Sequence, residues 1–363
     1  MPSRRPAAAL TAALLAVLVL IGACSPAGGT GGGSASGARL ADVEVLEDPG
    51  SYVGPSTAVL TDAALHPVAN NPTPQLPVTI TDAQGTEITV HDVSRILALD
   101  LYGTAARAVY ELGLGDNLVG RDTSSGFPEV ADLPLVTANG HELNGEAILG
   151  LAPSVIITDT SLGPWDVMLQ MRDAGIPVVV IDSHRSLETA PELIQQIADA
   201  LGVSEQGTEL AERTASSIDA MVAQIAEIAP DGDDKLRIAF LYVRGQSGIY
   251  YMFGTGSGTD SLITALGGVD VATEIGWEGM QPLTDEGLIA AAPALVLMMT
   301  KGLESVDGVD GLLERVPALA LTPAGQNQRI VDMSDYEILS FGSNSADVLE
   351  ALAVAIYAPQ ETE

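Results

Sequence analysis

The sequence has almost no cysteine, few histidines and few positively charged side chains. Cys24 is the only cysteine, so no disulfide can form within the chain. The 15 Lys and Arg residues stand against 48 Asp and Glu residues, and the formal net charge is −33 at pH 7. So much negative charge argues against binding to nucleic acid and against attachment through anionic lipid headgroups. It is typical of a well-solvated protein surface.

The motifs of the common enzyme classes are also missing. The sequence contains no Gly-x-Ser-x-Gly nucleophile elbow, no Walker loop and no histidine-rich metal motif. The glycine-rich segment 254–258 has no lysine after it, so we interpret it as the cap of a helix that begins at Thr259. We therefore expect a binding protein and not an enzyme.

One long apolar run is present, at the N-terminus. Arg4 and Arg5 precede the apolar residues 7–20, and small residues follow up to Ala23. A charged start, a short apolar core and small residues at a cleavage site define a secretory signal peptide. The cysteine that comes next resembles a bacterial lipobox, which implies a signal peptide of residues 1–23 and a lipid on Cys24. A membrane anchor that is never cleaved is the alternative interpretation.

Composition divides the rest of the chain. Residues 24–38 are rich in Gly, Ser and Ala and predict a flexible tether with an r.m.s. reach of roughly 20 Å. Residues 39–75 have little periodicity and indicate an irregular arm. We then expect an N-terminal lobe at 76–186, linking helices at 187–230 and a C-terminal lobe at 231–363.

Both lobes show strands that alternate with helices. In the first lobe, a hairpin is expected within 76–90, strands at 96–99, 117–120, 154–158 and 177–182, and helices at 104–112, 147–151 and 164–174. In the second lobe, strands are expected at 237–244, 248–252, 294–299 and 329–333, and helices at 258–266, 284–292, 311–316 and 344–357. A helix at 187–201 and a longer one at 208–229 lie between them. The pattern predicts an α/β protein with two βα lobes, one long joining helix and a ligand cleft between the lobes.

A polar loop in the first lobe carries His141. The loop leads into a short helix that Asn144 can cap and whose first turn contains Glu146. Ligands of open α/β sheets bind at loops outside the carboxyl ends of strands. We therefore expect His141 to bind the ligand, although a solvated loop histidine has the same appearance in a sequence.

The expected strand at 237–244 carries a second candidate. Alternation places Phe240, Tyr242 and Arg244 on one face. A guanidinium two residues from a phenol can donate a hydrogen bond to its oxygen and favour the phenolate, which is an anionic ligand suited to ferric iron. A tyrosine at the rim of a strand beside an exposed arginine is the plainer interpretation.

The small number of candidate ligands favours a haem over a bare metal ion. A protein site for a metal ion generally needs several ligands, whereas a haem supplies four nitrogens and needs one or two axial ligands from the protein. One histidine and one tyrosine, His141 and Tyr242, therefore suit haem better than zinc. Met280, Met298 and Met299 are expected in the core or against a flat apolar ligand.

These residues resemble a known class of proteins from about residue 75 to the end of the chain. The lipobox, the two lobes and the long helix are similar to the substrate-binding proteins of ABC importers for haem, cobalamin and siderophores. Within that class, residues 119–124, 139–144 and 241–245 resemble the HmuT-like haem-binding lipoproteins of actinobacteria. In that family the iron lies between a histidine of the first lobe and a tyrosine of the second, supported by an arginine. The resemblance transfers these roles to His141, Tyr242 and Arg244.

The resemblance implies one haem b per chain, carried as cargo and delivered to an ABC permease and its ATPase. It implies a monomer that is anchored through Cys24 to the outer leaflet of the cytoplasmic membrane. The haem propionates would need donors, for which Arg121, Ser124 and Ser125 are candidates. Acidic residues of this class dock on the permease, and the candidates here are Glu129 and Glu274.

Three other functions stay open on the sequence. A cobalamin or ferric-siderophore binder would have the same architecture, with the histidine and the tyrosine incidental. An extracellular hydrolase or metal chelatase would need a catalytic constellation that we do not find. A sensor or adhesin domain would use the acidic surface to bind a protein partner.

Overall fold

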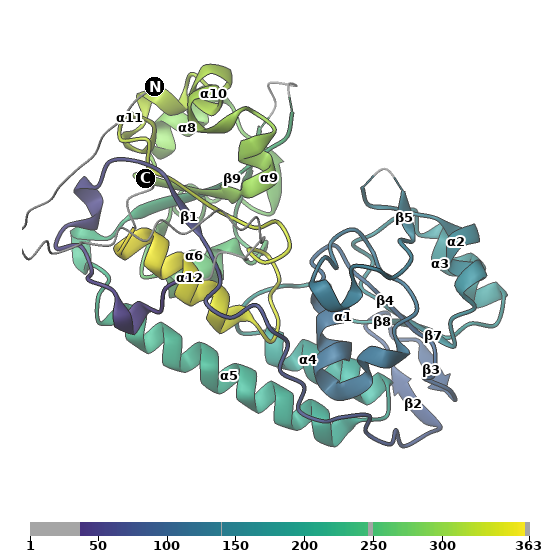
Figure 1. Cartoon of the computed structure of the whole chain (residues 1–363). Coiled ribbons are helices and arrows are strands. Elements are labelled where there is room, and N and C mark those ends of the chain that lie inside the picture. Colours follow the sequence, from purple (N-terminus) through teal and green to yellow (C-terminus); the bar gives the residue numbers. More distant parts are fainter. Residues whose placement is uncertain (1–36, 139, 246–249, 360–363) are drawn as a thin grey trace, which may run out of the picture. The chain divides into compact units, whose positions relative to one another are not determined.

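The computed structural model describes residues 37–138, 140–245 and 250–359. The predicted signal peptide, the predicted lipidation site Cys24 and most of the predicted tether therefore lie outside the described residues. Within the described ranges, no helix is both long enough and apolar enough to cross a membrane. Figure 1 shows the arrangement of the elements described below.

The first lobe is built on a small parallel sheet. Its strands pair in the order β4 (Ile96–Leu99), β7 (Val155–Thr158) and β8 (Val178–Val180). Every residue of the three strands is buried, as expected for a parallel sheet covered on both faces. One face packs against α1 (Thr104–Val109) and α4 (Ala190–Ala200), and the other against α2 (Gly145–Leu151) and α3 (Asp166–Asp173).

Two small hairpins complete this lobe. The predicted first hairpin is confirmed as β2 (Val78–Thr81) with β3 (Glu87–Val90), and a second consists of β5 (Thr137–Ala138) and β6 (Glu142–Leu143). The strand predicted at 117–120 is wrong. A 3-10 turn occupies Gly115–Asn117, and Leu118 makes only an isolated bridge to Ile96. Two apolar residues between turn residues are too few to extend a ladder.

Among its described residues, the second lobe contains a mixed sheet of seven strands. The strand order is β1-β14-β13-β9-β10-β12, with β11 paired to β9. Its strands are β1 (Ser56–Ala58), β9 (Arg237–Val243), β10 (Tyr250–Phe253), β11 (Val269–Asp270), β12 (Met280–Pro282), β13 (Leu295–Met299) and β14 (Ile330–Met333). The pairs among β1, β14, β13 and β9 are parallel, while β10 and β12 run antiparallel at one edge.

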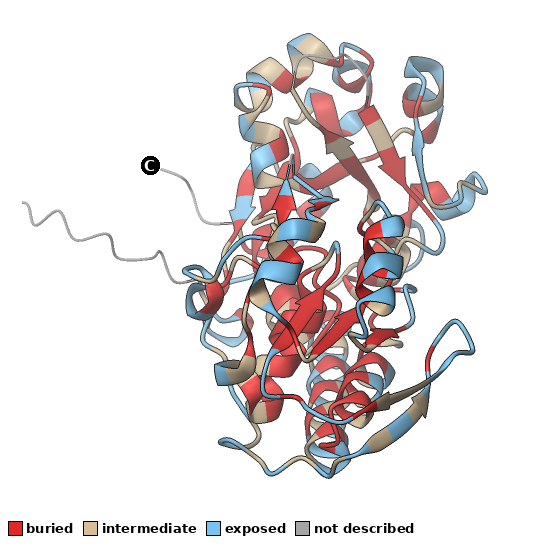
Figure 2. Ribbon diagram, turned by 90° about the vertical axis from the view of Figure 1, so that its right-hand side faces the viewer, coloured by how far each residue is buried: buried red, intermediate tan, exposed pale blue. Residues whose placement is uncertain are grey.

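Helices cover both faces of this second sheet. One face packs against α6 (Thr259–Ala265), α12 (Ser345–Tyr357) and part of α5. The other packs against α7 (Val271–Glu274), α8 (Asp285–Ala291), α10 (Gly308–Arg315) and α11 (Pro323–Gln326). The short α9 (Thr300–Glu304) follows β13 directly. Figure 2 shows the buried strands between these helices, whose outer faces are exposed.

The arm at 39–75 is more ordered than predicted. It contains 3-10 turns at Leu40–Asp42 and Pro49–Ser51, and β1 forms the edge of the second sheet beside β14. Leu40 and Leu60 are buried in the core of the second lobe. The second lobe therefore contains residues of this arm in addition to those expected at 231–363. A three-residue strand is too short to produce a recognisable alternation.

The predicted long helix joins the two lobes. Helix α5 (Ser204–Ala226) has 23 residues and is therefore about 35 Å long. Leu210 near its start is buried in the core of the first lobe, while Ile218 and Ile225 are buried in the core of the second. Thr214 is the polar residue on this buried face, and its hydroxyl donates to the carbonyl oxygen of Leu210 at 2.8 Å. One helix thus contributes to both cores.

Candidate functional site

His141 lies at the turn of the hairpin formed by β5 and β6. The turn precedes α2, and the side chain of Asn144 caps that helix by accepting from the backbone N–H of Ala147 at 3.1 Å. Asn139, which the sequence placed in the same loop, lies outside the described residues. The hairpin and the cap therefore position an exposed histidine away from the core of the first lobe.

The charge of Arg244 in the second lobe acts on His141. Partial shielding of the imidazole from solvent, and next the positive charge of Arg244, lower the pKa of His141. The two side chains therefore lie within electrostatic reach of each other. The lowered pKa also favours the neutral imidazole, which is the form that binds metal ions.

Tyr242 lies near the end of β9, on the face that packs against α6 and α12. Phe240, two residues earlier on the same face, is fully buried, whereas Tyr242 is only half-buried. The Tyr242 ring lies 6.3 Å from the ring of Tyr251 and 6.5 Å from that of Phe253, both on β10. The ring is therefore fixed by aromatic neighbours while its edge remains accessible.

Arg244 is fixed by two partners. Its Nε donates to the phenol oxygen of Tyr242 at 3.4 Å, which is the contact that the spacing predicted. Its Nη2 forms an ion pair with Asp335, whose side chain is only 10% exposed. Burial opposes the charge of the guanidinium, but these two hydrogen bonds outweigh it and raise the pKa of Arg244. The result is a cation held against a phenol oxygen.

Lys301 and Tyr336, also in the second lobe, lie near the Tyr242–Arg244 pair. The backbone N–H of Lys301 donates to Asp335 at 2.9 Å, so the same carboxylate contacts Lys301 and Arg244. The Lys301 ammonium donates to the phenol oxygen of Tyr336 at 2.8 Å and lies 4.0 Å from the centroid of its ring. A methyl group on Gly126 would lie 2.6 Å from that ring, so Tyr336 lies directly against the first lobe.

Sequence reasoning missed Asp335, Lys301 and Tyr336, although a usable signal exists. Arg244 follows β9, Lys301 follows β13, and Asp335 follows β14, and these strands are parallel neighbours. The carboxyl ends of parallel strands meet at one edge of a sheet, so polar residues after them gather there. Applying that rule to each strand in turn would have placed Lys301, Asp335 and the adjacent Tyr336 near Arg244.

The loop that contains Ser124 and Ser125 lies beside Tyr336, but its polar side chains are largely buried or already hydrogen-bonded. Asp122 fixes the loop by accepting from the backbone N–H of Ser125 at 2.8 Å, and Ser125 is fully buried. The guanidinium of Arg121 donates to the carbonyl oxygens of Ala131 and Asp122. Ser125 is therefore not available to a ligand, Arg121 is half-buried with its guanidinium bound to carbonyl oxygens, and Ser124 is half-buried.

The three methionines do not form one surface. Met299 is half-buried, packs against the Tyr242 face of the sheet and has its sulfur 4.0 Å from Arg244 Nη2. Met298 is fully buried on the opposite face, with Leu241 and Val243, because successive residues of a strand point to opposite faces. Met280 on β12 is 50% exposed. The structure therefore brings only Met299 to Tyr242.

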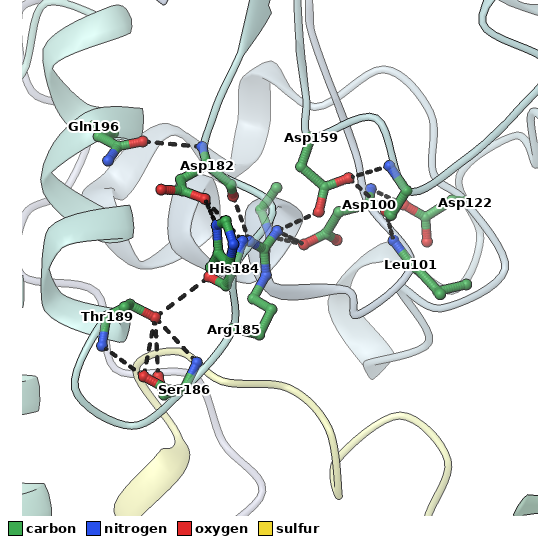
Figure 3. A network of polar contacts seen from close by, with 12 residues as sticks. Asp100, Leu101, Asp122, Asp159, Asp182, His184, Arg185, Ser186, Thr189 and Gln196 are labelled. Atoms are coloured by element: carbon green, nitrogen blue, oxygen red, sulfur yellow. Dashed lines mark hydrogen bonds and ion pairs between the residues drawn. The ribbon is translucent and has the colours of Figure 1, made fainter. Parts of the chain in front are cut away.

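A buried acidic cluster lies at the corresponding edge of the first sheet (Figure 3). Asp100 follows β4 and Asp159 follows β7, and both are fully buried and paired with the guanidinium of Arg185. Asp122 accepts from the backbone N–H of Asp100 at 3.0 Å. Burial raises the pKa of Asp100 to about 7 and that of Asp122 to about 6. These contacts fix the loop between β4 and α1 and the loop that contains Ser124.

The two candidate permease-docking residues, Glu129 and Glu274, have different surroundings. Glu129 is exposed, while Glu274 forms an ion pair with Arg237. Among the described residues no group of three or more His, Cys, Asp or Glu side chains is arranged to hold a metal ion. The two candidate axial ligands are therefore insufficient for a bare ion and adequate only for an iron that arrives with other ligands.

Comparison with known proteins places the chain in a family. Residues 101–337 match the family described as periplasmic binding protein. The crystal structure of heme binding protein HmuT is 41% identical, with a TM-score of 0.82, over 86% of this chain and 99% of that one. Crystal structures of HmuT with a histidine, a tyrosine or an arginine replaced by alanine match with TM-scores of 0.82, 0.83 and 0.83.

Relatives of lower sequence identity are also named as heme-binding or substrate-binding proteins. The apo form of the periplasmic heme-binding protein RhuT from Roseiflexus sp. RS-1 is 34% identical, with a TM-score of 0.67, over 73% of this chain and 98% of that one. The uncharacterized ABC transporter substrate-binding lipoprotein YvrC of Bacillus subtilis (strain 168) is 24% identical over 80% of this chain and 88% of its own length. The chain therefore belongs to the periplasmic binding protein family and, within it, to the HmuT-like substrate-binding proteins.

Proposed function

We propose that this protein binds haem b, with the iron between His141 and Tyr242, and delivers it to an ABC permease and its ATPase. The observation that carries the proposal is the hydrogen bond from Arg244 to the phenol oxygen of Tyr242 on the second lobe, with the exposed His141 of the first lobe within electrostatic reach of Arg244. A neutral imidazole and an arginine-supported phenol are both suited to ferric iron.

The ligand count supports a haem over a free ion. Two axial ligands complete the coordination of an iron that already has four porphyrin nitrogens. HmuT has been crystallised with a histidine, a tyrosine or an arginine replaced by alanine, and the last two lie two positions apart, as Tyr242 and Arg244 do, which supports the choice of these three residues. Members of the family are substrate-binding proteins, and we propose that this chain is likewise a carrier and not an enzyme.

The predicted lipobox supports an attachment to the membrane. We infer that a lipid on Cys24 retains the protein at the outer leaflet of the cytoplasmic membrane, facing outwards, and that residues 25–38 form the tether. A relative of this family, YvrC, is named a lipoprotein. Attachment would keep a monomeric carrier close to its permease.

A haemin titration of the full chain in detergent, followed by absorption spectroscopy, tests the proposal. We expect a saturable Soret change with an endpoint of one haem per chain. The Soret spectrum should differ in the His141→Ala and Tyr242→Ala variants if each side chain binds the iron. If no saturable Soret change occurs, the haem proposal is wrong, and titration with cobalamin and a ferric siderophore would follow.

A further inference from the structure

Lys301 is an unusual residue in this protein. The sequence has only two lysines, Lys235 and Lys301, in a chain of net charge −33. Lys301 is exposed, and none of the ion pairs found among the described residues involves its ammonium. An unpaired cation in so acidic a protein is positioned to attract an anion.

The ammonium is held in a defined place despite its exposure. It donates to the Tyr336 phenol oxygen at 2.8 Å and lies 4.0 Å from the ring centroid, within the range of a cation–π contact. The backbone of Lys301 is fixed by Asp335, the residue that also binds Arg244. A single carboxylate therefore links the position of Lys301 to that of the Tyr242–Arg244 pair.

Tyr336 extends this arrangement to the first lobe. Its ring lies against the backbone of Gly126, in the loop that contains Ser124. The ammonium and the phenol thus lie at the junction of the two lobes, beside the loop that contains the half-buried Ser124. They are the donors expected of a site for a carboxylate at the edge of a ligand.

The other cations near this junction already have partners. Arg244 is paired with Asp335, and the guanidinium of Arg121 donates to backbone carbonyl oxygens. Arg185 is buried with Asp100 and Asp159. The charges of Arg244 and Arg185 are compensated by carboxylates, and Arg121 is held by backbone carbonyl oxygens, so we assign the anionic group to Lys301.

We propose that Lys301 and Tyr336 bind a carboxylate of the ligand, a propionate of haem, and thereby select for a tetrapyrrole with a free acid at that edge. The inference rests on the proposed function, because it assumes that the iron lies at Tyr242. It replaces Arg121 and Ser125 as the propionate donors that the sequence suggested. Ser124 remains as a neutral donor from the first lobe.

Comparing haemin with its dimethyl ester tests the proposal. The ester carries the same iron and ring but has no ionised carboxylate. The full chain in detergent is titrated with each compound, as wild type and as Lys301→Met. We expect Lys301→Met to weaken haemin binding by about tenfold and to leave ester binding unchanged, since only the free acid forms a charge-assisted hydrogen bond. The wavelength of the Soret band should not move, because the axial ligands are intact.

Two variants serve as controls. Lys235→Met removes the other lysine, in the loop before β9, and should bind both compounds as wild type does. Lys301→Arg retains the charge and should recover most of the affinity for haemin. Circular dichroism on each variant checks that the fold is preserved.

The outcomes separate the two proposals. An equal loss of affinity for haemin and ester in Lys301→Met, or no loss for haemin, would overturn the role of Lys301 while haem binding by the wild type stands. No saturable Soret change with wild-type protein would instead overturn the proposed function and this inference with it.

Discussion

Asp335 forms an ion pair with Arg244, 91 positions away in the sequence. The pair fixes the guanidinium that donates to the phenol oxygen of Tyr242. Without Asp335, Arg244 would be a partly exposed side chain with several accessible rotamers. Asp335 is therefore a positioning residue for the candidate iron ligand.

The link between these two residues is testable by a double-mutant cycle. We expect Arg244→Ala and Asp335→Ala each to weaken haemin binding, the latter by roughly tenfold, or ~1.4 kcal/mol. Because Asp335 acts mainly through Arg244, Asp335→Ala should cost less affinity in the Arg244→Ala background than in the wild type, and the remaining cost should come from Lys301, whose backbone Asp335 also fixes. Haemin titrations of the four proteins measure the coupling.

A remote ion pair provides the control for that cycle. Asp307→Ala removes the exposed partner of Arg315 on α10 and should leave the affinity for haemin unchanged. Fully additive losses in the double variant would show that Asp335 does not act through Arg244.

The two candidate iron ligands should not contribute equally. We expect Tyr242→Ala to weaken haemin binding by roughly a hundredfold (~2.7 kcal/mol), and His141→Ala by less, because an arginine-supported phenolate is the stronger ligand for ferric iron. Tyr242→Phe keeps the ring that packs against Tyr251 and Phe253, so it separates loss of the oxygen from loss of packing. Equal or reversed losses in haemin titrations would count against this ranking.

The acidic cluster at Arg185 should make stability depend on pH. Burial raises the pKa of Asp100 to about 7, opposed by Arg185 and reinforced by Asp159, from an ordinary value of 3.8. The native state therefore binds a proton more tightly than the unfolded chain, so this group's contribution to stability falls as pH rises from about 4 to about 7.

Asp100→Asn tests this contribution. The variant lacks the titrating group, so its free energy of unfolding relative to wild type should be higher at pH 8 than at pH 4, by about 4 kcal/mol. Urea unfolding at a series of pH values measures the difference. The exposed Asp116→Asn is the matched control and should follow wild type throughout. A constant difference between Asp100→Asn and wild type over this range would contradict the assignment.

The lipid anchor is tested in cells of the source organism. Cys24→Ser removes the thiol that would carry the acyl chains, so the exported protein should move from the membrane fraction to the medium. Ser25→Ala, one position further, should leave the distribution unchanged. Fractionation and immunoblotting measure it, and continued membrane retention of Cys24→Ser would rule out this anchor.

Much of the architecture could be predicted because its signals are local. The buried strands at β4, β7, β9 and β13 are short apolar runs, and α5 shows a continuous apolar face. The segments that were missed, such as β1, form only because a strand far along the chain offers its edge. Their own residues carry no strong preference.

The candidate site likewise contains contacts that the sequence predicts and contacts that depend on the tertiary structure. The contact between Tyr242 and Arg244 follows from a spacing of two on one strand, so the sequence contains it. The positions of Asp335, Lys301 and Tyr336 depend on which strands are neighbours in the sheet. The burial of Ser125 and of Met298 likewise depends on which face or loop packs inward.

By itself, the sequence determined the two lobes, the long helix between them and the identity of the candidate ligands, because periodicity and short spacings are properties of consecutive residues. Only the tertiary structure decided that Arg244 lies within electrostatic reach of His141, that Asp335 fixes Arg244 and that Lys301 contacts Tyr336. Those relationships join residues from separate strands and lobes. Their physical basis is the convergence of strand ends at one edge of a sheet, which is set by strand order and not by local sequence.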